Sequence, residues 1–139
     1  MRRAALALLA AGTLGCASVR LVPVQILEAT PREAALLMRE PGILVVDVSP
    51  SDDYDGAHIF NAISIPRSQL WSRLGELGGN FDAPILVYDT RGERSGSAAQ
   101  MILDDGYNRV YELQGGLRVW TREGYPVVPT WEPQARRSP

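Results

Sequence analysis

Short apolar runs separated by amphipathic stretches make up most of the chain. Residues 43–48 and 84–88 are nearly continuous apolar runs rich in β-branched side chains, a pattern typical of strands that are covered on both faces of a parallel sheet. Shorter apolar runs predict three further strands, at residues 24–27, 63–66 and 110–113. The pattern therefore predicts five strands.

Helices are predicted between these strands. The sequence from Thr30 to Glu33 has threonine at the N-cap, proline at the first helical position and glutamate at the third, which is the capping-box pattern, and we expect this helix to reach about Arg39. Four more helical segments are expected, at residues 51–54, 68–77, 95–105 and 117–123. The apolar residues that define the second of these are Leu70, Trp71, Leu74 and Leu77. Alternating strands and helices predict an α/β domain with a mostly parallel five-stranded sheet and helices on both faces.

The first 16 residues have a different pattern. A basic start at Arg2 and Arg3 is followed by an apolar run from Ala4 to Leu14, which is the order of an export signal. The run is shorter than the roughly 20 apolar residues that cross a bilayer, and no later segment is longer. We therefore expect residues 1–16 to be a signal peptide and the processed protein to have no transmembrane helix.

Cys16, which follows the apolar run after one glycine, is the only cysteine in the chain. The segment from Thr13 to Cys16 resembles the lipobox of bacterial lipoproteins, in which the cysteine is acylated and becomes the first residue. This resemblance implies an envelope protein attached to the membrane by an N-terminal lipid, with residues 17–23 as a tether. Ordinary signal cleavage before Ser18 is the alternative, with Cys16 then only a small residue of a discarded leader. On either reading the folded domain has no thiol.

Composition and charge restrict the class of protein further. The chain is 45% hydrophobic, which predicts a single folded domain, assigned to residues 24–128. Without Arg2 and Arg3 it has 12 basic and 16 acidic residues, a net charge of −4, which argues against nucleic acid as a partner because phosphate binding needs a basic face.

Residues 126–139 are proline-rich without an apolar period, so we expect a frayed end, with a flexible tail at 129–139.

The order of the segments resembles the rhodanese-like family over residues 24–128, and implies its three-layer α/β fold. Four pieces carry the resemblance: residues 43–48, a strand ending in an Asp-Val pair; residues 53–66, which follow the family's Glu-Tyr-x-x-Gly-His-Ile-Pro-Gly-Ala-x-x-Ile-Pro stretch; residues 88–95, on the active-site loop; and residues 110–120, the closing strand, double glycine and tryptophan. Four such pieces in the family's order make chance agreement improbable.

The departures from the family pattern bear on function. Ser49, Ala57, Phe60 and Asn61 stand where the family has Arg, Gly, Pro and Gly. The decisive departure is at the start of the loop, where the family has a nucleophilic cysteine, then four residues, then arginine and serine. This chain has Asp89 at the cysteine position.

The resemblance implies that the loop is an anion nest, in which backbone N–H groups converge at the start of a helix. The loop residues are Asp89, Thr90, Arg91, Gly92, Glu93, Arg94 and Ser95. In active members the nest holds a thiolate that takes up sulfane sulfur as a persulfide, which a carboxylate oxygen cannot do stably. We expect the Asp89 carboxylate to occupy the nest itself, so that no intact catalytic residue is present.

The charged side chains of the loop have simpler structural interpretations. Arg94 can clamp a bound anion, but an ion pair with Asp89 or Glu93 is expected instead. Arg91 and Glu93 are expected to lie on the loop surface.

Two other features outside the loop resemble sites. His58, the only histidine, can act as a general base, but its position in the family pattern is structural, and a hydrogen-bonded role is expected. Asp52, Asp53 and Asp55 do not have the spacing of a calcium loop, and a solvated turn is expected. No metal and no cofactor is therefore predicted.

These observations favour a rhodanese-like lipoprotein of the cell envelope that lacks sulfurtransferase activity and serves as a binding or scaffolding module. Its partner is expected to be an envelope protein or a small anion. The alternative is an enzyme, either a sulfurtransferase that uses a partner's thiol or a hydrolase in which Asp89 is the general base and the arginines hold an oxyanion.

Overall fold

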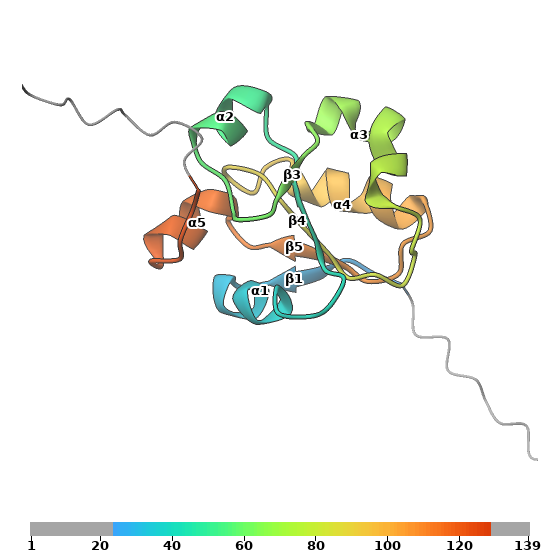
Figure 1. Ribbon diagram of the computed structural model, residues 1–139, viewed down its shortest axis with the longest axis horizontal. Helices are drawn as coiled ribbons and strands as arrows, with labels where there is room; N and C mark the ends of the chain where they lie inside the picture. The colour runs from blue at the N-terminus through green and yellow to red at the C-terminus, as the bar shows by residue number, and fades with distance from the viewer. Residues whose placement is uncertain (1–23, 129–139) are drawn as a thin grey trace, which may run out of the picture.

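The computed structural model describes residues 24–128, which form one α/β domain (Figure 1). Its strands are β1 (Leu27–Ala29), β2 (Leu44–Asp47), β3 (Ile63–Ser64), β4 (Ile85–Tyr88) and β5 (Val110–Leu113). Its helices are α1 (Pro31–Leu37), α2 (Ser51–Gly56), α3 (Arg67–Arg73), the 3-10 helix η1 (Leu74–Leu77), α4 (Ser95–Asp104) and α5 (Gly116–Arg122). The predicted alternation of strands and helices is confirmed.

The five strands form one sheet in the order β1-β5-β4-β2-β3, and every neighbouring pair is parallel. Because the strands are parallel, their carboxyl ends all lie at one edge of the sheet. In open α/β sheets this edge is where ligands bind. The predicted fold class, a five-stranded sheet with helices on both faces, is confirmed, and the sheet is parallel throughout.

Successive residues of the central strands face opposite sides, which explains their uninterrupted apolar sequence. Val46 and Val87 pack with α3, η1 and α4 in one buried cluster, whereas Val45 and Leu86 pack with α1 and α5 in another. Figure 1 shows the two helix pairs on opposite sides of the sheet. Both faces of the strands are therefore core.

The first strand lies later in the sequence than predicted. We expected residues 24–27, but β1 covers Leu27–Ala29 and pairs with β5 through Leu27–Tyr111 to Ala29–Leu113. Val24 is 55% exposed, whereas Ala29 is buried. The register of this edge strand is set by a partner far away in the sequence, which a local apolar run does not reveal.

Trp71 does not belong to the apolar face of α3, contrary to the prediction. Its side chain is 68% exposed, whereas Leu70, Leu74 and Leu77 are buried. The three leucines follow a spacing of four and three residues, which places them on one side of a helix. Trp71 is one residue out of that phase and points to solvent.

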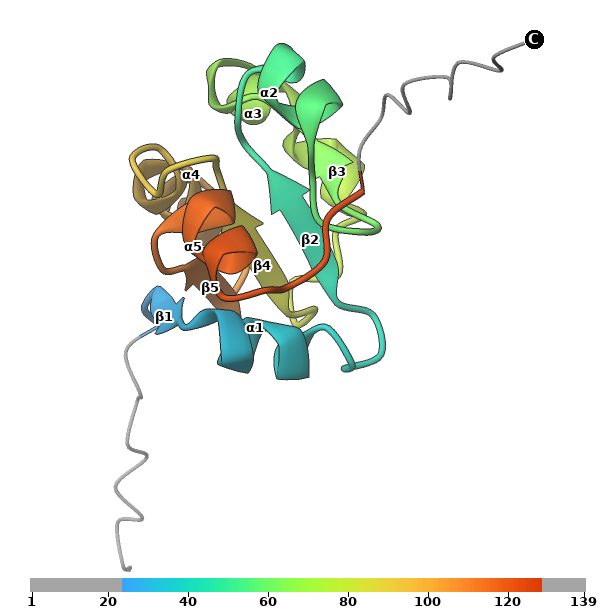
Figure 2. The same cartoon turned by 90° about the vertical axis from the view of Figure 1, so that its left-hand side faces the viewer.

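The end of the domain is more ordered than predicted. The expected frayed end began at residue 126, but Val127 packs on the core and Val128 pairs with His58 in an antiparallel bridge. The indole N–H of Trp120 donates to the Pro126 carbonyl at 2.9 Å. Figure 2 shows this segment running from α5 past β2 toward the far edge of the sheet.

The predicted signal peptide, Cys16, the tether at 17–23 and the tail at 129–139 lie outside the described residues. Between residues 24 and 128, no helix is long and apolar enough to cross a membrane.

Candidate functional site

The loop between β4 and α4 lies at the carboxyl edge of the sheet. It follows Tyr88, the last residue of β4, and ends where Ser95 begins α4. Because β4 is central in the sheet, the loop lies between the segments that follow β2 and β5. All seven predicted site residues, Asp89 to Ser95, are therefore in one strand-loop-helix connection.

Asp89 is completely buried, and its carboxylate accepts hydrogen bonds from the loop backbone. Oδ1 accepts the Gly92 N–H at 2.8 Å, and Oδ2 accepts the Glu93 and Arg94 N–H groups at 3.2 and 3.3 Å. A buried carboxylate needs such donors to offset its lost hydration. The expectation that Asp89 accepts the N–H groups of the loop is confirmed.

The first turn of α5 donates two backbone hydrogen bonds to the loop. Leu117 N–H donates to the Asp89 carbonyl at 2.9 Å, and Arg118 N–H to the Thr90 carbonyl at 3.0 Å. This approach requires glycine at position 116, where φ is +62° and a Cβ would lie 2.2 Å from the Asp89 carbonyl oxygen. The double glycine of the sequence thus lets α5 touch the loop.

Hydroxyl groups attach the loop to its other neighbours. Thr90 Oγ1 donates to Asp53 on α2 at 3.1 Å, and lies 3.2 Å from the hydroxyl of Ser49, which follows β2. Ser95, fully buried, donates to a carboxylate oxygen of Glu112 on β5 at 2.7 Å. The loop is thereby attached to its neighbours at both ends.

Arg94 does not form the ion pair that we expected. No carboxylate lies within 4.0 Å of its guanidinium in the described residues. The Asp89 carboxylate is turned inward onto backbone amides, and Glu93 is exposed. Arg94 is therefore a cation without an acidic partner in this part of the chain. Arg91 and Glu93 are exposed, as expected.

Arg94 lines a pocket of about 220 Å³ beside the loop, together with Arg67 at the start of α3. The remaining lining residues are Val48, Pro50, Pro66 and Ser68. Arg67 Nε donates to the Ser97 hydroxyl, which in turn donates to the Arg94 carbonyl. Arg67 also has no carboxylate within 4.0 Å in the described residues. The pocket thus combines two unpaired guanidinium groups with apolar walls.

His58 has the structural role that we expected. Its ring lies parallel to Tyr54, with centroids 3.9 Å apart, and its Nδ1 is 3.0 Å from the Tyr54 carbonyl oxygen. Its backbone forms the bridge to Val128. These contacts fix the segment that connects α2 to β3.

Two ionisable groups are buried at the ends of β2 and β4. Burial raises the pKa of the Asp47 carboxyl, although its Oδ1 accepts the Ser49 N–H at 2.8 Å. Burial, and then the negative charge of Asp47, raise the pKa of Tyr88, whose hydroxyl accepts the Ile59 N–H at 2.9 Å. Their side chains accept backbone N–H groups of the segments that follow β2 and α2.

Sequence reasoning missed three contributors to this region, namely Arg67, Glu112 and Asp47. Each lies within three residues of the carboxyl end of a strand, and polar residues at that edge are the available signal. Among the described residues, no group of three or more His, Cys, Asp or Glu side chains is arranged to hold a metal ion. Asp52, Asp53 and Asp55 lie on the short exposed helix α2.

The sheet is parallel throughout, and a loop lined by backbone amides lies at its carboxyl edge. These features assign the chain to the α/β domains that carry their site at that edge. The rhodanese-like domain family matches residues 30–123, and the chain belongs to this family. It is 33% identical over 97 residues to the thiosulfate sulfurtransferase GlpE of Pseudomonas fluorescens, covering 70% of this chain and 86% of that protein.

Other relatives agree with this assignment. The chain is 37% identical over 76 residues to protein YqhL of Bacillus subtilis, covering 55% of this chain and spanning 59% of that relative. Among solved structures, a rhodanese-related protein of Thermoplasma volcanium has a TM-score of 0.66 at 28% identity, covering 74% of this chain and 98% of that chain.

Proposed function

We propose that this chain is a rhodanese-like binding module that does not transfer sulfur. The observation that carries the proposal is the buried Asp89 carboxylate, which takes up the three inward N–H groups of the loop. The family resemblance aligns Asp89 with the nucleophilic cysteine, and a carboxylate oxygen forms no stable persulfide. The residues from 24 to 128 contain no cysteine that can replace it.

The same contacts argue against a hydrolase in which Asp89 is the general base. A general base must reach the proton that it removes, directly or through one water. Asp89 is completely buried, and its two oxygens are engaged by backbone amides. Its carboxylate therefore serves the loop and not a substrate.

The ligand that fits the pocket beside the loop is a small oxyanion. Arg67 and Arg94 supply planar donors suited to such anions, and Ser68 adds a hydroxyl to the lining. Thiosulfate, named in the sulfurtransferase relatives, and sulfate are suitable probes. In this proposal the anion binds beside the nest, because Asp89 fills the nest.

A sulfur-transfer assay tests the proposal directly. The full chain and Asp89→Cys are assayed for transfer from thiosulfate to cyanide. We expect no turnover by the unchanged chain, and turnover by the cysteine variant because the loop keeps its amide donors. Sulfur transfer by the unchanged chain refutes the proposal.

Titration of the same chain with thiosulfate and sulfate tests the pocket. Arg67→Ala and Arg94→Ala are each expected to weaken binding about fivefold or more, since each removes a charged donor. Arg122→Ala, at the end of α5, is the matched control and should bind as the unchanged chain does. Equal binding by all four proteins refutes the anion site.

We further propose that the module is exported and attached to the cell envelope by a lipid on Cys16. The support is the basic start, the short apolar run and the cysteine that follows it. A radiolabelled fatty acid should be incorporated into the unchanged chain and into Ser18→Ala, but not into Cys16→Ser. Labelling of Cys16→Ser would contradict this assignment.

A further inference from the structure

Trp71, on α3, is the most exposed of the large hydrophobic side chains in the described part of the chain, at 68%. Its ring stacks on no other aromatic ring there. A single exposed apolar residue needs no explanation by itself. The position of Trp71 is informative because of the residues that lie next to it on the helix.

The same face of α3 carries two residues of the pocket beside the loop. Helical residues three and four positions apart are neighbours, about 5–6 Å apart at Cβ, so Arg67 and Ser68 lie on the N-terminal side of Trp71. A helical side chain leans toward the N-terminus and covers the preceding turn. The indole of Trp71 is thus directed toward the pocket that Arg67 and Ser68 line with Arg94. We call these four residues the α3 surface.

The two guanidinium groups of the α3 surface lack an acidic partner. Neither Arg67 nor Arg94 has a carboxylate within 4.0 Å between residues 24 and 128. Arg67 donates through Nε to the Ser97 hydroxyl, which donates to the Arg94 carbonyl at 3.0 Å. These contacts fix the guanidinium of Arg67 and leave its two terminal nitrogens for another acceptor. An acidic group is therefore the complement of this surface.

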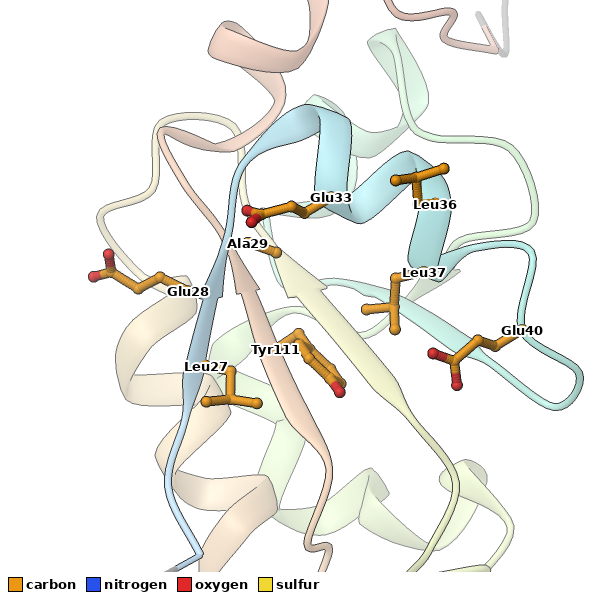
Figure 3. A pocket seen from close by; sticks show the side chains of 8 residues that line it. All are labelled: Leu27, Glu28, Ala29, Glu33, Leu36, Leu37, Glu40 and Tyr111. Carbon is orange, nitrogen blue, oxygen red and sulfur yellow. The ribbon is translucent and has the colours of Figure 1, made fainter.

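The larger groove of the domain differs in this respect. It has a volume of about 490 Å³, lies between β1, α1 and Tyr111, and has an apolar centre from which Glu28 points away (Figure 3). All three of its glutamates have partners within the chain: Glu28 accepts from Gln114, Glu33 from Thr30, and Glu40 from Arg109. Charge therefore selects no partner for that groove, whereas it selects an acidic one for the α3 surface.

The size of the pocket favours an anion that is part of a larger molecule. Its volume of about 220 Å³ is below the roughly 300–1,000 Å³ of sites that enclose small organic ligands. Trp71 lies outside the pocket on the open surface of α3, where a free small molecule would not be enclosed. A protein segment meets both features, since one side chain enters the pocket and a second packs on the indole. Arginine and tryptophan are also enriched among the residues that dominate protein–protein binding.

We propose that the α3 surface binds an extended acidic segment of a partner protein, in which an aspartate or glutamate is followed two positions later by a large apolar residue. In an extended chain such residues point the same way and lie about 7 Å apart. This distance is close to the rise of about 6 Å between Arg67 and Trp71 along α3. The proposal rests on the anion site proposed above and names the kind of molecule that carries the anion.

The first experiment uses the full chain and a peptide of about ten residues, too short to form a stable helix. The peptide has glutamate at position i, phenylalanine at i+2, and glycine and serine elsewhere. An uncharged fluorophore at the N-terminus and an amide at the C-terminus leave glutamate as the only charged group. Fluorescence anisotropy should show saturable binding that weakens with salt.

Two matched peptides test which side chains are recognised. One has glutamine in place of glutamate, and the other has alanine in place of phenylalanine. Each should bind at least about fivefold more weakly, because each lacks one of the two contacts. If either matched peptide binds as well as the first peptide, the proposal is overturned.

Variants of the chain separate the partner site from the anion site. Trp71→Ala is expected to weaken peptide binding about tenfold and to leave sulfate binding unchanged, whereas Arg67→Ala should weaken both. Leu36→Ala, an exposed leucine of α1 on the other face of the sheet, is the matched control and should bind the peptide normally. Equal effects of Trp71→Ala and Leu36→Ala overturn the proposal.

Failure of this inference and failure of the anion site have different signatures. Binding of sulfate without binding of the peptide overturns the inference and leaves the anion site intact. Binding of neither refutes the anion site, and the inference with it.

Amide chemical shifts test the other occupants of the α3 surface. With the peptide added, the largest shifts should fall at the starts of α3 and α4, and largest shifts elsewhere overturn the proposal. If these resonances move with protein concentration alone, a second copy of the chain is the occupant. If they move when residues 129–139 are deleted, the chain's own tail is the occupant. Either result overturns the assignment to a partner protein.

Discussion

Substituting Asp89 by asparagine tests whether the carboxylate fills the loop. Asparagine has nearly the same shape but no charge, and one of its two terminal atoms is an N–H donor. If its oxygen keeps the 2.8 Å bond from Gly92, its NH₂ group faces the N–H groups of Glu93 and Arg94. If the amide is reversed, donor meets donor at Gly92 instead. Both orientations lose hydrogen bonds.

The expected cost follows from these contacts. In either orientation at least one of the three bonds is lost and the others lose their charge, at about 1 kcal/mol each, so the free energy of unfolding should fall by about 2–3 kcal/mol. For a domain of this size the melting temperature should fall by about 10 °C or more.

The measurement is thermal and urea denaturation of the full chain near neutral pH. Asp55→Asn, on the exposed helix α2, is the matched control and should differ from the unchanged chain by less than about 0.5 kcal/mol. An Asp89→Asn protein as stable as the control would refute the interpretation that the carboxylate is needed to satisfy the loop.

Further predictions concern the contact of α5 with the loop and the buried acid behind it. Gly116→Ala should destabilise the domain by about 3 kcal/mol or more in urea denaturation, because its Cβ would overlap the Asp89 carbonyl and its φ is positive. Gly75→Ala is the control and should be nearly neutral, because the space around Gly75 is open. Similar losses of stability in both variants would contradict this prediction. Because burial raises the pKa of Asp47, the folded state holds its proton more tightly than the unfolded state. The unfolding free energy of the unchanged chain relative to Asp47→Asn should therefore fall as the pH rises from about 3.9 through the raised pKa. A difference that grows with pH over this window would show that the shift has the opposite sign.

The central part of the fold could be predicted from the sequence because its signals are local. The apolar runs at 43–48 and 84–88 predict β2 and β4, and both faces of these strands are buried in the structure. The capping box at the start of α1 is also a local signal, and Thr30 and Glu33 exchange the expected hydrogen bonds. The position of β1 depends on pairing with β5, which no local pattern contains.

In the loop too, contacts with residues nearby in the sequence could be predicted, whereas contacts with distant elements could not. That Asp89 accepts the loop amides could be predicted because all the partners lie within five residues. The ion pair predicted for Arg94 with Asp89 or Glu93 was wrong, because Asp89 is turned into the loop and Glu93 does not come within 4.0 Å of the guanidinium. The role of Arg67 depends on how α3 lies against α4, and this packing brings Arg67 to Ser97. Contacts between distant elements were therefore the part that the sequence did not reveal.

The pairing of β1 with β5 also bears on how fast the domain reaches its native state. Leu27 pairs with Tyr111, and the backbone hydrogen bonds from α5 to the loop come from Leu117 and Arg118. Bringing together residues that are far apart in the sequence costs chain entropy before the contacts between them can stabilise the fold. Chains rich in such distant pairings fold in about milliseconds to seconds. The first strand to be synthesised, β1, therefore cannot pair in the sheet until β5, the last strand, is available.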